Sequence, residues 1–192
     1  MERSKGLILA AAFIAAPIAL AHPGHGGGLA AGVAHPVSGI DHVLAMVAVG
    51  LLAAQTGSRA IWMLPLTFVS LMLMGGVLSL GHAPVPLVEQ GIMASVLVLG
   101  VLVAMAGKVP MFVATGSVGL FAVFHGYAHV TEMRSGSSPA AYAAGFIVAT
   151  ILLHAVGLGV GQIARRSVSQ VVSRIAGASI AVCGLLLFTG IL

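Results

Sequence analysis

The chain has 192 residues, of which 59% are hydrophobic and only 6% are charged. A soluble domain carries charge on about a quarter of its residues, so an ordinary soluble protein is excluded. The formal net charge of +4 is scattered along the chain without a basic cluster, which argues against a nucleic-acid partner. Histidine is the exception to this shortage of polar groups, because its eight copies equal all lysines and arginines together.

The first residues have the features of a secretory signal. Two basic residues precede an apolar run, 7–20, which ends in Ala-Leu-Ala, a sequence that suits cleavage. We therefore predict that residues 1–21 are a cleavable signal peptide. Residues 22–33 are rich in glycine and are predicted to form a flexible extracytoplasmic tail.

The remaining chain, 34–192, is predicted to be one all-α transmembrane domain. Glycine, proline and charged residues divide it into six apolar stretches, each long enough to cross a bilayer as a helix at about 1.5 Å per residue. Backbone groups in lipid must be paired within a segment, which favours helices over open strands. The predicted spans are residues 34–54, 60–80, 87–107, 110–130, 140–161 and 174–192.

Basic residues predict how the spans are oriented. A cleaved signal places the mature amino terminus outside, so the first, third and fifth loops face the cytoplasm. These three loops contain Arg59, Lys108, Arg165, Arg166 and Arg174. The outer loops contain Arg134 alone, in agreement with the positive-inside rule. We expect a multi-pass protein of a bacterial inner membrane with both mature termini extracytoplasmic.

Six spans can also be two sets of three, the second inverted relative to the first. The sequence ASVLVLG at 94–100 in the third span resembles ASIAVCG at 178–184 in the sixth. Because alanine, valine, leucine and glycine dominate every span, chance resemblance and a true repeat both stay open.

The first predicted span opens with a motif of ionisable residues. His35 and His42 are seven residues apart, which places them on one face of a continuous helix two turns apart. Asp41 is adjacent to His42, and both are expected about 9 to 11 Å below His35 along the helix axis. Pro36 suits the first turn of this helix, where its missing N–H would be unpaired anyway.

A second group of ionisable residues ends the fourth predicted span. His125 and His129 are separated by four residues, and Glu132 follows three residues later, so all three lie on one helical stripe. This span runs outward and therefore brings its stripe to the same depth as the first motif. Imidazole and carboxylate groups are donors for divalent metals such as nickel, cobalt and zinc.

The two motifs together predict one metal site in the outer half of the membrane. Its candidate ligands are His35, Asp41, His42, His125, His129 and Glu132. Asp41 fits either a direct ligand or a group that orients a metal-bound histidine.

Several other polar residues have open roles. His82 fits a solvated loop residue, and Glu89 fits a partner of a helix amino terminus. For His154, in the fifth span, packing and function are equally compatible with the sequence. The tail residues His22 and His25 fit either metal collection or a dispensable segment.

The two motifs resemble those of a known family. The pattern His35-Pro-x-x-Gly-x-Asp-His42-x-x-Ala-Met46, together with Phe124-His125-Gly-x-Ala-His129-x-x-Glu132-Met, is similar to the HupE/UreJ family of nickel or cobalt permeases. This resemblance covers the mature chain and implies a six-span inner-membrane permease that supplies metal for hydrogenase or urease maturation.

We therefore expect a secondary permease, not an enzyme, that imports Ni2+ or Co2+ as its substrate and holds no resident cofactor. The alternative is a membrane-embedded zinc-dependent hydrolase in which a carboxylate such as Glu132 is the base. Two further hypotheses for paired intramembrane histidines are a b-type haem protein and a metal-free proton carrier.

Overall fold

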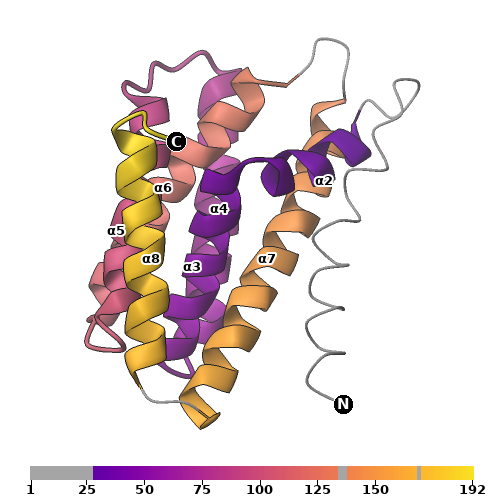
Figure 1. The fold of residues 1–192 in the computed structure, drawn as a ribbon. Helices are drawn as coiled ribbons and strands as arrows, with labels where there is room; N and C mark the ends of the chain where they lie inside the picture. Colours follow the sequence, from indigo (N-terminus) through magenta and orange to yellow (C-terminus); the bar gives the residue numbers. More distant parts are fainter. Residues whose placement is uncertain (1–27, 134–137, 168–169) are drawn as a thin grey trace, which may run out of the picture.

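The computed structural model describes residues 28–133, 138–167 and 170–192. Within these ranges the chain forms seven α-helices and no strand, which confirms the predicted all-α class. The helices are α2 (Leu29–Ser38), α3 (Ile40–Thr56), α4 (Ala60–Leu80), α5 (Val88–Ala104), α6 (Met111–Thr131), α7 (Pro139–Ser167) and α8 (Gln170–Phe188). The longer helices run side by side as a bundle, and α2 lies at an angle across one end (Figure 1).

The bundle has the outer surface of a membrane protein. Four helices, α4, α6, α7 and α8, are long and apolar enough to cross a bilayer, and the bent pair of α2 and α3 would make a fifth span. Helix α5 is apolar but shorter, with 17 residues. Large apolar side chains point away from the bundle, among them Trp62 and Phe112, which are 74% and 78% exposed. The chain is thus a multi-pass membrane protein, while the count of six spans stays a prediction.

The two ends of the bundle differ in the elements that they carry. We call the end with α2 and the turn at 81–87 the upper end, and the end with the connections at 57–59 and 105–110 the lower end, as drawn in Figure 1. At the lower end, the guanidinium of Arg165 on α7 donates a hydrogen bond to the carbonyl oxygen of Ala54 near the end of α3. This bond ties the lower ends of two helices together.

Glycine allows the helices to approach closely. The most extensive helix contacts are those of α4 with α6, α5 with α8, and α3 with α7. A Cβ atom at Gly157 of α7 would collide with the carbonyl oxygen of Val47 on α3. A Cβ atom at Gly126 of α6 would likewise collide with the carbonyl oxygen of Met72 on α4. Backbone contact of this kind is how small residues join helices where the hydrophobic effect cannot.

These helix pairs bear on the predicted repeat. Exchanging the first three predicted spans for the last three converts the α3–α7 pair into the α6–α4 pair and leaves the α5–α8 pair unchanged. These three pairings are compatible with two inverted three-helix repeats, but α3 also packs against α4 and α5, whereas α6 makes little or no contact with α7 and α8. The repeats stay a prediction.

The predicted first span, 34–54, is not one continuous helix. Helix α2 ends at Ser38, α3 begins at Ile40, and the two are bent by 85° at Gly39, whose backbone is extended. A Cβ atom on Gly39 would lie 2.6 Å from Oδ1 of Asp41 and 2.8 Å from Nδ1 of His42, so glycine leaves room for both side chains. The expectation that His35 and His42 share one face of a single helix, with His42 two turns below, is therefore wrong.

The segment before the bend also differs from its prediction. Helix α2 begins at Leu29, so residues 29–33 of the predicted tail belong to a helix that packs against α7. Pro36 lies in the last turn of α2 instead of in a first turn, because Gly39 ends that helix three residues later. The predicted signal peptide, 1–21, and the tail histidines His22 and His25 lie outside the described residues, as does Arg134.

Candidate metal centre

Three imidazoles from three helices meet at the upper end of the bundle. His35 comes from α2, His42 from the first turn of α3, and His129 from the last turn of α6. One ring nitrogen of each lies within 4.8 Å of the other two. Three nitrogens bound to one metal ion lie about 3.4 to 3.6 Å apart in tetrahedral or trigonal geometry, since each metal–nitrogen bond is about 2.1 Å long. A contraction of roughly one ångström would therefore place all three on one ion.

The bend at Gly39 is what brings His35 to this cluster. Because α2 turns away from the axis of α3, His35 lies over the upper end of the bundle. The centroid of its ring is 5.5 Å from the ring of His42 and 4.8 Å from that of His129. The rings of His42 and His129 are 4.7 Å apart, which closes a triangle of imidazoles. The prediction that these residues meet holds, although the helix geometry behind it does not.

Asp41 orients the imidazole of His42. Nδ1 of His42 donates a hydrogen bond of 2.8 Å to Oδ1 of Asp41, because an ionised carboxylate can only accept. With its proton held on Nδ1, neutral His42 carries its lone pair on Nε2. That atom is buried and has no hydrogen-bond partner among the described residues. A carboxylate behind a histidine in this way is the usual support for a metal-binding imidazole.

The imidazole of His125, one turn below His129 on α6, is also oriented by a hydrogen bond. Its Nδ1 donates a hydrogen bond of 2.9 Å to the carbonyl oxygen of Phe121, which leaves the lone pair on Nε2. Nε2 of His125 is buried without a partner in the described chain, and so are both ring nitrogens of His129. The rings of His125 and His42 are 5.2 Å apart. Since unpaired buried polar groups are uncommon in proteins, this concentration of free imidazole nitrogens points to a ligand.

Glu132 closes the cluster on its exposed side. It is the residue at the carboxyl end of α6, and its Oε2 lies 3.2 Å from Nε2 of His35. The Glu132 side chain is 51% exposed, whereas His42, His125 and His129 are buried. All six predicted site residues therefore lie in one connected group, with a carboxylate at its rim and three buried imidazoles beneath.

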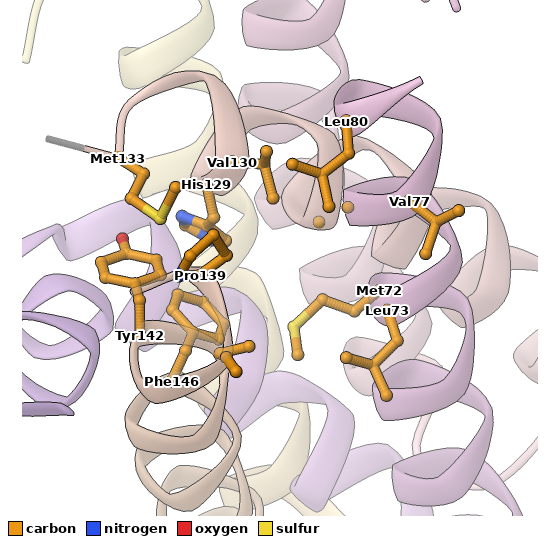
Figure 2. A pocket seen from close by; sticks show the side chains of 14 residues that line it. Met72, Leu73, Val77, Leu80, His129, Val130, Met133, Pro139, Tyr142 and Phe146 are labelled. Atoms are coloured by element: carbon orange, nitrogen blue, oxygen red, sulfur yellow. The ribbon is translucent and has the colours of Figure 1, made fainter. Parts of the chain in front are cut away.

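Helix α7 supplies an aromatic wall for the cluster. The ring of Phe146 is centred 3.9 Å from the ring of His129, and that of Tyr142 is centred 6.2 Å from the ring of His35. On the far side of these rings lies a cavity of about 350 Å³ between α4, α6 and α7, with His129 at its edge (Figure 2). Apart from that imidazole and the Tyr142 ring, its labelled lining in Figure 2 is aliphatic, sulfur-containing or phenyl. The cluster thus borders an apolar space, which it meets at His129 and at these two aromatic rings.

The other polar candidates among the described residues lie outside the cluster. His82 is exposed in the upper turn and has a left-handed backbone, with φ at 55°. Glu89 is exposed in the first turn of α5, where its charge favours the amino end of the helix. His154 is buried in the middle part of α7 and contacts a phenylalanine.

Sequence reasoning missed the contributions of Gly39, Tyr142 and Phe146. For Gly39 the sequence does contain an indication, since a glycine often follows the last residue of a helix. A signal for the wall was weaker: Tyr142 is one of two tyrosines in the chain, and Phe146 follows it at the four-residue spacing of one helical face.

The fold and the cluster define a class: a multi-pass helical membrane protein with a group of imidazoles and carboxylates at one end. Comparison with known proteins identifies the family. The family model described as "HupE / UreJ protein" matches residues 9–187, and the chain belongs to the HupE/UreJ family. It is similar to "Protein HupE" of Rhizobium leguminosarum bv. viciae, with 43% identity over 191 residues that cover 99% of this chain and 100% of the relative. No solved structure matches it.

Proposed function

We propose that this protein is a secondary permease that imports a divalent metal ion, Ni2+ or Co2+, from the extracytoplasmic side. The observation that carries the proposal is the triangle of His35, His42 and His129, whose donor atoms come from three helices and lie within 4.8 Å of one another. Neutral imidazoles with free lone pairs are good ligands for both ions. The ion is the substrate of this site and not a resident cofactor.

The arrangement of charge at the site suits capture of a cation. Glu132 is exposed at the rim, so it meets a hydrated ion before the buried imidazoles do. Asp41 adds a second negative charge behind His42 and offsets part of the charge that the ion brings into the bundle. A carrier must also release its ion, so binding has to remain moderate. Three imidazoles that must first contract to reach one ion fit that requirement.

The proposed orientation places the upper end outside the cell. Arg59, Lys108 and Arg165 belong to the lower end, where the positive-inside rule puts the cytoplasm. In this orientation, in a bacterial inner membrane with six spans, both mature termini are extracytoplasmic. The family resemblance suggests that the imported metal serves the maturation of a metalloenzyme, hydrogenase or urease.

Uptake of radiolabelled nickel into proteoliposomes tests this function. We expect the wild-type protein to accumulate nickel, and His42→Ala to lose uptake by more than about 100-fold, since even removing a group that only supports a metal ligand costs about 10- to 100-fold. The matched control is His82→Asn, an exposed histidine of the upper turn whose left-handed backbone asparagine tolerates. Wild-type uptake by a folded His42→Ala protein would refute the proposal. Cobalt and zinc as competitors would rank the substrates.

Membership in the HupE/UreJ family gives no support to the zinc-dependent hydrolase alternative. Hydrolysis would also need a pocket that orients an organic substrate, and the cavity beside His129 is lined mainly by apolar side chains.

A further inference from the structure

His154 lies deep in the bundle, away from the six residues of the upper cluster. It is the sixteenth residue of the 29-residue helix α7, near the helix midpoint, and only 3% of it is exposed. Neither of its ring nitrogens has a hydrogen-bond partner among the described residues. A histidine kept for packing is expected to satisfy at least one nitrogen, because an unpaired buried polar group costs free energy.

The helix that carries His154 connects it to the upper cluster. Tyr142, Phe146, Thr150 and His154 follow one another at four-residue intervals, so they form one stripe along α7. All four residues are buried. The first two contact His35 and His129, as described above, and the last two continue the stripe downward. At about 1.5 Å per residue, His154 lies roughly 12 Å below Phe146 along the axis of α7.

Thr150 provides a second unpaired polar group on this stripe. Its side chain is completely buried, and its hydroxyl oxygen has no hydrogen-bond partner in the described part of the chain. A threonine inside a helix normally satisfies its hydroxyl with the carbonyl of the preceding turn, as Thr56 does with Leu52. The unpaired hydroxyl oxygen of Thr150 and the unpaired ring nitrogens of His154 thus lie one turn apart on α7.

One aromatic ring contacts both His154 and the upper cluster. The ring of Phe68 on α4, fully buried, is centred 5.6 Å from the ring of His125 and 5.1 Å from the ring of His154. His125 is the lowest imidazole of the cluster, and its Nε2 is free. The Phe68 ring therefore packs against both the lowest imidazole of the cluster and the imidazole of His154.

We propose that His154 is a transfer ligand, which takes the metal ion from His125 at the bottom of the upper cluster, with Thr150 as an auxiliary oxygen donor. The proposal rests on the proposed function as a metal permease. A neutral imidazole with free nitrogens lowers the free energy of a partly dehydrated ion at the middle of the bundle, where apolar neighbours would not. The ion then moves in two short steps instead of one long step through an apolar core.

The test separates binding at the upper cluster from passage through the bundle. The variants are His154→Phe, which keeps an aromatic ring in the same space, and His154→Gln, which keeps a polar group but no imidazole. Nickel affinity is measured on purified protein by equilibrium dialysis, and nickel uptake is measured in proteoliposomes. We expect both variants to retain wild-type nickel affinity and to lose uptake by at least about tenfold, the lower end of the cost of disturbing a metal site.

His42→Ala provides the opposite signature, because it loses binding and uptake together. If wild-type protein takes up no nickel, the proposed function fails, whatever the His154 variants do. If wild-type protein transports nickel and either His154 variant transports it at the wild-type rate, the transfer role is overturned and His154 is a packing residue. Loss of nickel affinity in both variants would also overturn it, since His154 would then belong to the upper site or to its support.

Discussion

The two ends of the bundle hold different kinds of ionisable group. At the upper end, imidazoles and carboxylates from α2, α3 and α6 face one another, and buried ring nitrogens are left without partners. At the lower end, a polar cavity of about 320 Å³ is lined by residues that include Gln55, Arg165 and Gln170. Amide and guanidinium groups are poor ligands for a divalent metal cation, and the positive charge of a guanidinium repels it. In the proposed permease, the upper end would hold the metal ion and the lower end would favour its departure.

The backbone differs between the two ends as well. At the upper end the first apolar segment is broken at Gly39, and the break places donors from two helices around one point. At the lower end α3 runs unbroken beside α7, and Arg165 bonds to the carbonyl oxygen of Ala54. Irregular backbone within a membrane protein is tolerated where it lines a site. Under the proposed function, the break serves metal binding, while the continuous helices below keep the bundle together.

The largest effect in this comparison is expected from Asp41→Asn. Asparagine has nearly the same shape but no charge, and its amide does not hold the proton of His42 on Nδ1 as firmly as a carboxylate does. We expect nickel affinity to fall about 10- to 100-fold, as for other groups that support a metal-bound histidine. Equilibrium dialysis measures the change, and Arg165→Gln at the lower end is the comparison variant. Equal losses of affinity in both variants would show that the two ends do not differ in metal binding.

A smaller effect is expected from Gly39→Ala at the break itself. The backbone angles of Gly39 are accessible to any residue, so alanine is not excluded by the backbone. Its Cβ would instead press on the side chains of Asp41 and His42, at 2.6 and 2.8 Å. Displacing this pair should weaken nickel binding roughly tenfold, the lower end of the cost for a disturbed supporting group.

The matched control for Gly39→Ala is Gly116→Ala on α6. A Cβ atom at Gly116 would meet no atom within 4 Å, so this variant should bind nickel as the wild-type protein does. Normal binding by Gly39→Ala would mean that the Asp41–His42 pair tolerates displacement, and the break would lose its proposed purpose.

Sequence reasoning succeeded where the geometry is local. His125, His129 and Glu132 lie within one helix, and Asp41 and His42 are neighbours, so spacing alone predicts their arrangement. It failed for the path of the chain around His35, because the direction of α2 depends on its packing against α7. Gly32 and Gly145 permit that packing by close backbone approach, a contact between residues more than a hundred positions apart.

The wall of the site was beyond sequence reasoning for the same reason. Tyr142 and Phe146 meet the imidazoles only because α7 returns to the upper end beside α2 and α6. A four-residue spacing of aromatic residues is compatible with a lipid-facing stripe or a core stripe, and only tertiary packing decides between them. Six candidate ligands could thus be named from the sequence, whereas their three-dimensional arrangement could not.

Substitutions in the α3–α7 contact below the site are expected to have the smallest effect on metal binding. They should instead have the clearest effect on the stability of the protein. At Gly157, a Cβ atom would collide with the backbone of Val47, whereas at Gly159, two residues further along α7, nothing lies within 4 Å. We expect Gly157→Ala to destabilise the protein by about 1 to 3 kcal/mol, the usual cost of overpacking. Gly159→Ala should leave it unchanged or stabilise it by about 0.5 to 1 kcal/mol, since alanine is the better helix former. Thermal unfolding in detergent distinguishes the two.

If Gly157→Ala is as stable as Gly159→Ala, close backbone contact does not hold these helices together. If Gly157→Ala loses nickel affinity as strongly as Asp41→Asn, the continuous helices and the broken one do not have separate tasks.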